Sequence, residues 1–422
     1  MKLIDKDLMS MQEVRELVES AKEAQRELAR MDQAQVDRIV KSIADAGVRN
    51  AKRLAQMAQE DTGFGVVSDK VVKNVFASRG VYEHIKDMKT IGEIERDDAK
   101  GLRKIAVPVG VIAGLIPSTN PTSTAFYKSE IAIKSGNAIV FSPHPTALRA
   151  IMETVKVIRQ AIAEAGANEN LVSCISIPTM EATSTLMHHR DIALILATGG
   201  SAMVKAAYSS GTPAIGVGPG NGPAYLEKTC DLPLAVKRIM DSETFDNGTI
   251  CASEQSIICD EDMAEAVQAE MERQGAYFLD EQEREQLGRF ILRANGTMNP
   301  EIVGKSVKTI ASLAHLDKVP ADARVLVAKE TGVGRGHPYS NEKLGPIMGF
   351  YTGKDYIDVC EKVCTILYYE GAGHTFSMHT KDDKMVDYFA KRVPASRIMV
   401  NTPSALGGIG ATTNLQPALT LG

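Results

Sequence analysis

The chain has 422 residues, of which 44% are hydrophobic and 24% are charged, and its formal net charge is −5. A chain of this length exceeds the size at which one hydrophobic core keeps growing, so we expect two domains of roughly 200 residues each. The acidic balance gives no basic surface for nucleic acid, and six scattered cysteines are too sparse for a disulfide scaffold. The apolar runs are too short to span a bilayer and the N-terminus lacks a secretory core, which predicts a cytoplasmic protein with reduced thiols and no membrane partner.

Apolar residues recur at helical spacing in two N-terminal runs, from Val14 to Leu28 and from Val36 to Ala58. These runs predict an antiparallel helical layer, which a further helix over Asp69 to Ile85 extends. The next segment, Thr90 to Lys104, is polar and rich in charge, which predicts a hairpin or an extended arm. Such an arm would serve the assembly of an oligomer.

Strand and helix patterns then alternate, which predicts a doubly wound α/β sheet. We expect Pro223 to Leu226 to close this sheet. The predicted strands cover residues 109–116, 138–141, 171–177, 192–197 and 214–217, and the predicted helices cover 125–134, 147–164, 181–188 and 202–209.

A second α/β series follows a helix over Leu232 to Ser242, so we place the start of the second domain near Ser242. Its predicted strands cover residues 255–259, 324–328, 347–351, 375–378 and 397–400, and its helices cover 261–274, 281–293, 356–367 and 382–392. The expected domains are a nucleotide-binding domain over 1–241 with the arm at about 90–105, a catalytic domain over 242–400, and a C-terminal return segment over 401–422.

The most informative segment is Phe245-Asp-Asn-Gly-Thr-Ile-Cys251-Ala-Ser-Glu-Gln255. Its small and turn-forming residues place the Cys251 thiol just before an apolar strand, which is typical of an exposed backbone corner that a reactant can approach. The alternative is an inert thiol. Cys360 and Cys364 lie four residues apart on an apolar helix and are interpreted as core thiols.

Three loops rich in glycine and small polar residues end predicted strands: Pro117 to Thr122, Thr198 to Ser201, and Gly216 to Gly222. Loops at the carboxyl ends of parallel strands bind ligands, and the loop at Thr198 lies between a strand and a helix, where backbone N–H groups would hold a pyrophosphate. No G-x-G-x-x-G fingerprint is present there, and plain turns are the alternative.

Two side chains are candidates for accessory roles. Asn120, at the end of a buried strand, offers an amide donor for a developing oxyanion, or else caps the following helix. His374, in Glu370-Gly-Ala-Gly-His-Thr375, follows a glycine turn and would either reach a cleft or lie at the surface. Neither of the adjacent histidines His188 and His189 has a cysteine or carboxylate at metal-ligand spacing, so we predict no metal site.

In this order, the motifs Ser118-Thr-Asn-Pro121, Lys134-Ser-Gly-Asn137, Thr198-Gly-Gly-Ser201, the cysteine segment and Glu342-Lys-Leu-Gly-Pro346 resemble those of the aldehyde dehydrogenase superfamily over nearly the whole chain. The cysteine segment, Ala207-Tyr-Ser-Ser-Gly211, Gly216-Val-Gly-Pro-Gly-Asn221 and Asn401-Thr-Pro-Ser404 are similar to the CoA-acylating branch. That branch includes the aldehyde-oxidising half of bifunctional aldehyde–alcohol dehydrogenases.

The resemblance implies a reaction in which Cys251 attacks an aldehyde, the Asn120 amide and the Cys251 backbone N–H stabilise the oxyanion, and hydride passes to NAD. The acyl thioester on Cys251 is then transferred to coenzyme A, and the cycle is reversible. Acetaldehyde or another short aldehyde is the expected substrate. The resemblance also implies a set of cofactor-binding residues, Pro117, Ser118, Thr119, Ser142, Thr198, Gly199, Gly200, Ser201, Gly218, Gly220 and Glu342, the last on the nicotinamide ribose.

Two departures from the hydrolytic relatives are informative. Those relatives carry a glutamate base in a Glu-Leu-Gly-Gly motif, whereas Gly216-Val-Gly-Pro-Gly220 has no carboxylate, which favours CoA over water as the acyl acceptor. Hydrolytic members also place a lysine and a glutamate on the adenosine ribose, and Phe141-Ser-Pro-His-Pro145 has neither. NADP would therefore be tolerated, and CoA would enter the same adenine pocket after NADH leaves.

His374 matches a histidine frequent in the acylating branch, which implies a proton shuttle toward the CoA thiol. A homo-oligomer is expected, and packaging in a bacterial microcompartment is compatible with this branch. The rival interpretations are an enzyme of the γ-glutamyl-phosphate reductase type from the same superfamily, which the cysteine segment argues against, and a non-catalytic nucleotide-binding or structural homologue.

Overall fold

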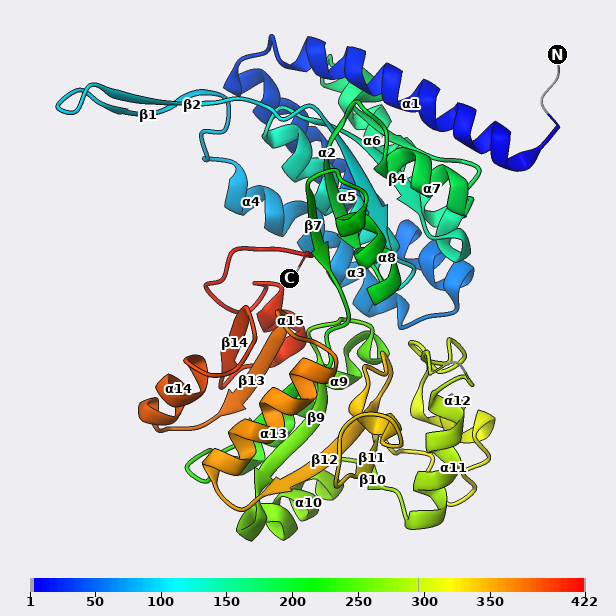
Figure 1. The fold of residues 1–422 in the computed structure, drawn as a ribbon, viewed down its shortest axis with the longest axis vertical. Helices are drawn as coiled ribbons and strands as arrows, with labels where there is room; N and C mark the ends of the chain where they lie inside the picture. Colours follow the sequence, from blue (N-terminus) through cyan, green and yellow to red (C-terminus); the bar gives the residue numbers. More distant parts are fainter. Residues whose placement is uncertain (1–3, 295, 421–422) are drawn as a thin grey trace. The chain divides into compact units, whose positions relative to one another are not determined.

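The computed structural model describes residues 4–294 and 296–420, and its ribbon is shown in Figure 1. These residues form two compact units, of which the first comprises 4–62, 67–217 and 417–420 and the second comprises 63–66, 218–294 and 296–416. Each unit contains a parallel sheet covered by helices, so the predicted α/β class is confirmed. Among the helices of these ranges, none is both long enough and apolar enough to cross a membrane.

The sheet of the first unit has the strand order β5-β4-β3-β6-β7, and all of its neighbouring strands are parallel. The chain starts at the central strand β3, runs outward on one side through β4 and β5, and then returns to the other side of β3. This reversal between β3 and β6 is the position where doubly wound sheets bind ligands. The strands are β3 (Val111–Ile116), β4 (Ala138–Pro143), β5 (Val172–Cys174), β6 (Ile192–Thr198) and β7 (Ala214–Val217).

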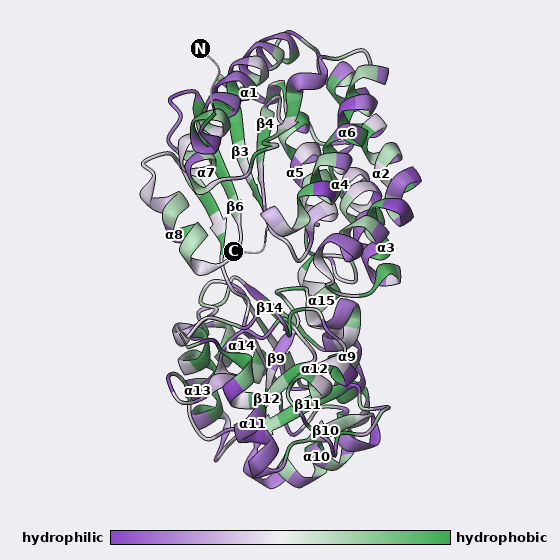
Figure 2. Ribbon diagram, turned by 90° about the vertical axis from the view of Figure 1, so that its right-hand side faces the viewer, coloured by the Kyte–Doolittle hydropathy of each residue, from purple (hydrophilic) through white to green (hydrophobic). Residues whose placement is uncertain are grey.

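Helices cover both faces of this sheet (Figure 2). On one face α2, α5 and α6 contact one another, and on the other α1 contacts α7. The bounds are α1 (Lys6–Leu28), α2 (Gln33–Thr62), α5 (Pro121–Lys134), α6 (Leu148–Glu164), α7 (Met180–Met187) and α8 (Ser201–Ser209). The single helix predicted over Asp69 to Ile85 is instead α3 (Val67–Val75) and α4 (Val81–Ile85), separated by a π-helical turn.

The arm predicted near residues 90–105 is a two-stranded antiparallel hairpin of β1 (Gly92–Asp97) and β2 (Leu102–Ala106). In Figure 1 the hairpin projects away from the helices of its own unit. Its strands are mostly exposed, and the exposed side chains include the apolar residues Ile94, Leu102 and Ile105. An isolated hairpin of this kind is marginally stable in water, so its apolar side chains favour a covering partner.

The sheet of the second unit has the parallel order β10-β11-β12-β9-β8-β13-β14. Side chains alternate along its strands: Ala224 and Ile257 pack with α9 and α10 on one face, whereas Tyr225 and Ile258 pack with α13 and α14 on the other. The strands are β8 (Gly222–Leu226), β9 (Glu254–Asp260), β10 (Ala276–Phe278), β11 (Val325–Lys329), β12 (Ile347–Gly353), β13 (Thr375–His379) and β14 (Arg397–Val400).

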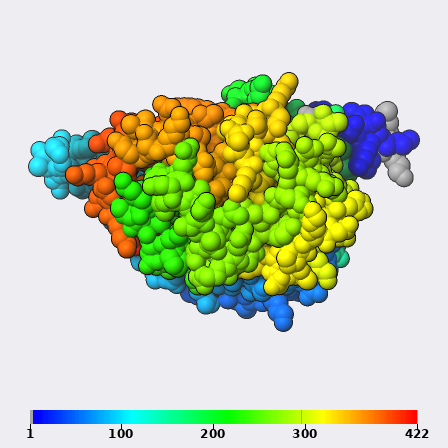
Figure 3. Space-filling model, turned by 90° about the horizontal axis from the view of Figure 1, so that it is seen from below, coloured from blue at the N-terminus to red at the C-terminus, as the bar shows by residue number. Residues whose placement is uncertain are grey.

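The helices of the second unit follow its strands in the chain, as the alternation predicts. Their bounds are α9 (Leu232–Thr244), α10 (Ala264–Arg273), α11 (Glu281–Ile291), α12 (Val307–Leu313), α13 (Tyr356–Tyr369), α14 (Asp383–Ala390) and α15 (Ser404–Gly408). Helices α11 and α12 and the edge of the sheet enclose a further cluster of buried hydrophobic side chains. Figure 3 shows the surface of this unit from below, with green and yellow segments beside the orange segment that contains α13.

The prediction that Pro223 to Leu226 closes the first sheet is wrong. This segment is β8, which pairs with β9 and β13 inside the second sheet. The boundary between the compact units therefore falls after Val217, ahead of the boundary predicted near Ser242. A short, fully buried strand carries no periodic signal that tells which sheet it joins, because both of its faces are apolar.

Three short elements, β10, α12 and α15, were not predicted, and β5 is shorter than the predicted strand over 171–177. Three-residue strands fall below the length that a pattern of alternating residues resolves. At the end of the chain, Ala418 and Leu419 pack against the core of the first unit. The C-terminal segment thus returns from the second unit to the first.

His379 ends β13 in a fully buried position, and neither ring nitrogen has a hydrogen-bond partner among the described residues. Burial lowers its pKa to about 4, because a charged imidazolium would be desolvated there. The unfolded chain protonates this histidine at about pH 6.5. Because the pKa of His379 is lower in the folded protein than in the unfolded chain, the stability that comes from neutral His379 is present above pH 6.5. This stability is lost as the pH falls toward 4.

Replacing His379 by leucine should reduce this loss of stability. Between pH 7 and pH 5 the wild type should lose about 2 kcal/mol more of its free energy of unfolding than H379L, measured by urea unfolding at both pH values. The exposed His188 provides the control, since H188L should retain the full pH dependence of the wild type. Equal losses in wild type and H379L would contradict this origin of acid sensitivity.

Candidate active site

Cys251 lies in the second unit, between the short turn Phe245–Gly248 and the first residue of β9. The residues on either side of it, Ile250 and Ala252, are buried, and Cys251 itself is partly exposed. The prediction of an exposed backbone corner is therefore wrong for the segment as a whole. Its small residues serve close packing, and the thiol belongs to the part of the segment that remains accessible.

The turn before Cys251 has an uncommon backbone. Asp246, Asn247 and Gly248 have positive φ values of 50°, 51° and 71°. Aspartate and asparagine tolerate the left-handed region better than other residues with a side chain, yet each still costs about 1 kcal/mol there. Such a conformation persists only when the surroundings hold it, so the contacts of this turn explain how Cys251 is placed.

The Asp246 carboxylate holds the turn. Its Oδ1 accepts a hydrogen bond from the Val66 N–H at 2.6 Å, and its Oδ2 accepts one from the Thr249 hydroxyl at 2.7 Å. Gly65 lies so close that a Cβ there would be 1.9 Å from Asp246 Oδ1. The segment 63–66 is distant in sequence, yet it supports the turn that precedes Cys251.

A second loop, which carries the Gly-Pro-Gly-Asn motif, contacts Cys251. A Cβ at Gly220 would lie 1.6 Å from the carbonyl oxygen of Cys251, so only glycine fits there. The Gly220 N–H donates a hydrogen bond of 2.7 Å to Glu342 Oε1. The structure thus brings together three predicted site residues, Cys251, Gly220 and Glu342.

Glu342 is buried, and this burial raises its pKa to about 8. The hydrogen bond from Gly220 opposes that shift, and the charge of Glu370 adds to it. Asn221, which follows Gly220 in the chain, fastens the same loop, because its side-chain amide donates hydrogen bonds to the carbonyl oxygens of Ser340 and Glu370. In this structure Glu342 therefore supports the loop beside Cys251, and its contact with a ribose stays a prediction.

His374 is buried, with 2% of its surface exposed, so the predicted surface position is wrong, and its reach into a cleft stays a prediction. Its Nδ1 lies 2.8 Å from the Thr375 hydroxyl, and its Nε2 has no hydrogen-bond partner among the described residues. Burial lowers its pKa to about 4, so the imidazole is neutral at pH 7. A neutral ring with a vacant nitrogen can accept a proton.

Asn120 occupies the N-cap position of α5 in the first unit, but its side chain makes no capping hydrogen bond. Instead its Oδ1 accepts a hydrogen bond of 2.7 Å from the Lys73 ammonium. A second buried lysine, Lys70, donates to the carbonyl oxygen of Thr119 at 3.2 Å. Both lysines lie outside the predicted set of site residues. The sequence does contain a signal for them, since they lie on the same turn of a predicted helix that also has Val71, Val72 and Val75.

The ends of β3 and β6 are joined by Lys128, whose ammonium donates to the carbonyl oxygens of Leu115 at 2.7 Å and Leu196 at 2.8 Å. Burial lowers the pKa of this lysine to about 7. Its neutral form still has two N–H donors, enough for both carbonyls. Lys128 thereby sets the spacing of two loops that bear predicted cofactor residues, Pro117 to Thr119 and Thr198 to Ser201.

The N-terminus of α8 fits a phosphate group. Ser201 begins the helix, Gly200 precedes it without a capping side chain, and no acidic residue lies in the first turn. The predicted residues Thr198 and Gly199 lead into this turn from β6. Ser142 differs, because it is buried in β4 and its hydroxyl lies 2.8 Å from the Thr183 hydroxyl. The remaining predicted residue, Gly218, belongs to the second unit.

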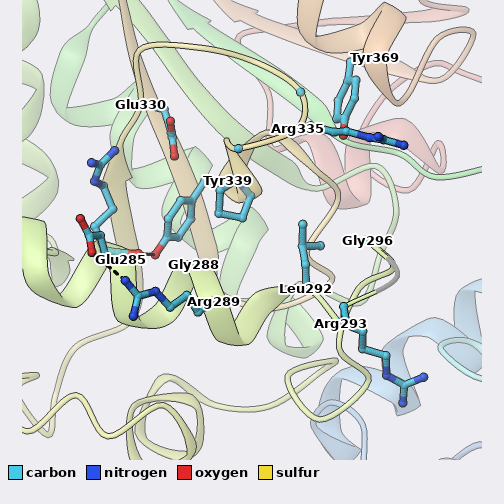
Figure 4. A pocket seen from close by; sticks show the side chains of 15 residues that line it. Glu285, Gly288, Arg289, Leu292, Arg293, Gly296, Glu330, Arg335, Tyr339 and Tyr369 are labelled. Atoms are coloured by element: carbon cyan, nitrogen blue, oxygen red, sulfur yellow. Dashed lines mark hydrogen bonds and ion pairs between the residues drawn. The ribbon is translucent and has the colours of Figure 1, made fainter.

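A cavity of about 1090 Å³ lies beside α11 and the segment 330–339 (Figure 4). Arg289, Arg293 and Arg335 line it, but in Figure 4 these side chains point in different directions, and Arg289 pairs with Glu285. None of the predicted site residues is among the described residues that line it. We therefore assign it no part in the candidate site.

Cys360 and Cys364 lie on α13, as predicted. Cys360 is buried, and burial raises its pKa to about 12, which makes it a poor nucleophile. Cys364 Sγ lies 3.6 Å from the carbonyl oxygen of Arg392. This geometry agrees with the interpretation of both residues as structural thiols.

The model of the aldehyde dehydrogenase family matches residues 3–294. The chain belongs to this family. It is 62% identical to a probable aldehyde dehydrogenase of Listeria monocytogenes whose crystal structure superposes with a TM-score of 0.97 and covers 99% of this chain and 92% of that one. An acetylating aldehyde dehydrogenase of Geobacillus thermoglucosidasius is 50% identical, with a TM-score of 0.97, and covers 100% of this chain and 92% of that one.

The expected resemblance to the acylating branch and to bifunctional aldehyde–alcohol dehydrogenases is confirmed. The bifunctional aldehyde–alcohol dehydrogenase AdhE of Escherichia coli is 45% identical over 415 residues, which are 97% of this chain and 46% of that protein. The chain therefore spans about half the length of that relative. A propionaldehyde dehydrogenase of Rhodopseudomonas palustris, crystallised with bound CoA and an acylated cysteine, is 29% identical, with a TM-score of 0.86 over 96% of this chain and 91% of that one.

Replacing Gly65 by alanine should disturb the turn of Cys251. Gly65 and Gly336 both have positive φ, at 72° and 93°, but only Gly65 faces a neighbouring atom that a Cβ would strike. We expect G65A to lower the free energy of unfolding by about 2 kcal/mol more than G336A does, in urea titrations. The rate of Cys251 alkylation by iodoacetamide should change more than twofold in G65A alone, and unchanged alkylation there would contradict the supporting role of residues 63–66.

Proposed function

We propose that the protein is an NAD-dependent, CoA-acylating aldehyde dehydrogenase, which converts an aldehyde, CoA and NAD⁺ reversibly to acyl-CoA, NADH and a proton. The observation that carries the proposal is the built environment of Cys251, a thiol on a strained turn that Asp246 and Gly220 hold from two sides. The acetylating relative and the relative with an acylated cysteine support it.

In the proposed cycle the Cys251 thiolate attacks the carbonyl carbon, and the carbonyl electron pair moves to oxygen. The amide of Asn120, whose oxygen is engaged by Lys73, donates to that oxyanion. Bound NAD⁺ supplies the hydride acceptor. As the carbonyl re-forms, hydride leaves the carbon and Cys251 retains the acyl group as a thioester.

Acyl transfer then requires an acceptor. The sequence Gly216 to Gly222 provides no carboxylate to deprotonate water, and the place of a side chain at Gly220 is taken by the Cys251 carbonyl. A thiol is partly ionised near neutral pH and needs less assistance than water does. The CoA thiolate therefore attacks the thioester carbon and releases the Cys251 thiolate, and His374 Nε2 accepts the proton of the CoA thiol.

The residues of the first unit fit a nicotinamide dinucleotide. The open N-terminus of α8 at Ser201, together with Thr198 to Gly200, would hold its phosphates, and Pro117 to Thr119 would lie beside it. The segment Phe141 to Pro145 has no carboxylate to repel a 2′-phosphate, so NADP is tolerated. Glu342 would bind the nicotinamide ribose after releasing Gly220.

We propose a homo-oligomer assembled through the hairpin arm. The exposed apolar residues of β1 and β2 support it, since an oligomer covers such side chains. The expected cytoplasmic location and packaging in a microcompartment stay predictions. A non-catalytic homologue is disfavoured, because such a protein would not need three left-handed residues in front of one thiol.

Purified protein mixed with acetaldehyde, NAD and CoA should form NADH in proportion to the CoA added. Cys251→Ala should abolish this signal, whereas Cys364→Ala should retain it, as followed by absorbance of NADH and by mass spectrometry of acyl-CoA. Formation of NADH that is independent of CoA, or no NADH at all with a panel of short, hydroxylated and acidic aldehydes, would refute the proposal.

His374→Ala should slow acyl transfer to CoA by at least 10-fold while acyl-enzyme formation changes by less than about threefold, since a general base contributes 10²- to 10⁴-fold to its own step. Stopped-flow measurement of the NADH burst, compared with the steady-state rate at saturating CoA, separates the two steps. His188→Ala is the matched exposed control. Equal slowing of both steps would remove the proton-transfer role.

A further inference from the structure

Helix α3 places two buried lysines beside the residues at the end of β3. Lys70 and Lys73 are 3% and 4% exposed, and lysines are almost never buried to this degree without partners. Lys73 Nζ donates to Asn120 Oδ1 at 2.7 Å, and Lys70 Nζ donates to the Thr119 carbonyl at 3.2 Å. Both ammonium groups therefore act on the segment that carries the proposed oxyanion donor.

The contact with Lys73 fixes which way the Asn120 amide points. An ammonium only donates hydrogen bonds, so it can face only the oxygen of the amide and never its NH₂ group. With Oδ1 engaged, Nδ2 is directed to the side of the amide group opposite Lys73 and lies 3.3 Å from the Thr119 hydroxyl. The donor that the oxyanion needs is thus presented in one orientation.

The position of Lys73 is itself fixed by its neighbour in the chain. Asn74 donates to the carbonyl oxygen of Ala51 at 3.0 Å and accepts a hydrogen bond of 2.7 Å from the Thr122 hydroxyl. These contacts tie α3 to α2 and to the first turn of α5, which begins immediately after Asn120. The Lys73 and Asn120 side chains are consequently carried by elements that are fastened to each other.

We propose that Lys73 is a positioning residue for the oxyanion step, a role that rests on the proposed aldehyde dehydrogenase activity. It holds the Asn120 amide in the donating orientation, and its positive charge draws electron density toward Oδ1 and makes the Nδ2 hydrogens better donors. Preorganised donors of this kind stabilise an oxyanion without reorganising during the reaction. The role concerns formation of the acyl enzyme and leaves the intrinsic reactivity of the thiol unchanged.

A double-mutant cycle of Lys73→Met and Asn120→Ala tests this coupling. With aldehyde and NAD and no CoA, we expect K73M to slow the NADH burst by about 10- to 100-fold in the wild-type background, somewhat less than the loss of an oxyanion donor itself. In the N120A background K73M should slow it by less than threefold, because its target is gone. K73R, which can still donate to Oδ1, should restore at least a third of the lost rate.

The controls separate this role from a structural one. The rate of Cys251 alkylation by iodoacetamide without cofactor should be the same in wild type and K73M within a factor of two. Lys134→Met removes another buried lysine at the far end of α5, where it pairs with Asp37, and should leave the burst rate unchanged. Equal slowing by K73M in both backgrounds, or a parallel fall in alkylation, would overturn the proposal.

Crystal structures of the wild type and K73M provide a readout that does not depend on activity. The amide of Asn120 should point in one direction in the wild type and should be turned or disordered in K73M. An unchanged Asn120 side chain in K73M would overturn the proposal. Absence of NADH formation by the wild type, in contrast, would refute the aldehyde dehydrogenase activity and would leave this structural comparison valid.

Discussion

Cys251, the proposed nucleophile, is positioned by backbone that approaches too closely for side chains to intervene. Gly220 lies against the carbonyl of Cys251, and Gly65 lies against the carboxylate of Asp246, so that either contact is lost if a Cβ is added. Because these glycines come from loops far apart in the sequence, the Cys251 turn is determined by its surroundings more than by its own preferences. The strain of its left-handed residues is balanced by hydrogen bonds that the Asp246 carboxylate accepts and the Asn247 amide donates.

Buried charged side chains perform a related task in the first unit. Lys128 joins the ends of β3 and β6, while Lys70 and Lys73 engage the carbonyl of Thr119 and the amide oxygen of Asn120. Burial of each amino group is costly, and the hydrogen bonds to these oxygens recover part of that cost. A hydrophobic side chain of the same size could pack at each of these positions, but it would make no hydrogen bond to orient the neighbouring carbonyl or amide groups.

The loop of Gly216 to Gly222 bears on the proposed acyl intermediate. A loop that holds a glutamate base in hydrolytic relatives here contributes only backbone to the site, and the carboxylate that reaches it, Glu342, is occupied by the Gly220 N–H. In the proposed cycle, water near the thioester would lack a base, whereas a thiol would provide its own ionised nucleophile. This difference supports CoA as the proposed acyl acceptor.

The sequence by itself determined the α/β class, most strands and helices, and the family, and it singled out Cys251 and Asn120 as candidates, because periodicity and motifs depend on residues close together in the chain. Only the tertiary structure assigned Gly222–Leu226 to the second sheet, buried His374 and the flanks of Cys251, and placed Lys73 on Asn120 and Glu342 on Gly220. These features depend on contacts between residues 32 to 122 positions apart, which no local pattern encodes.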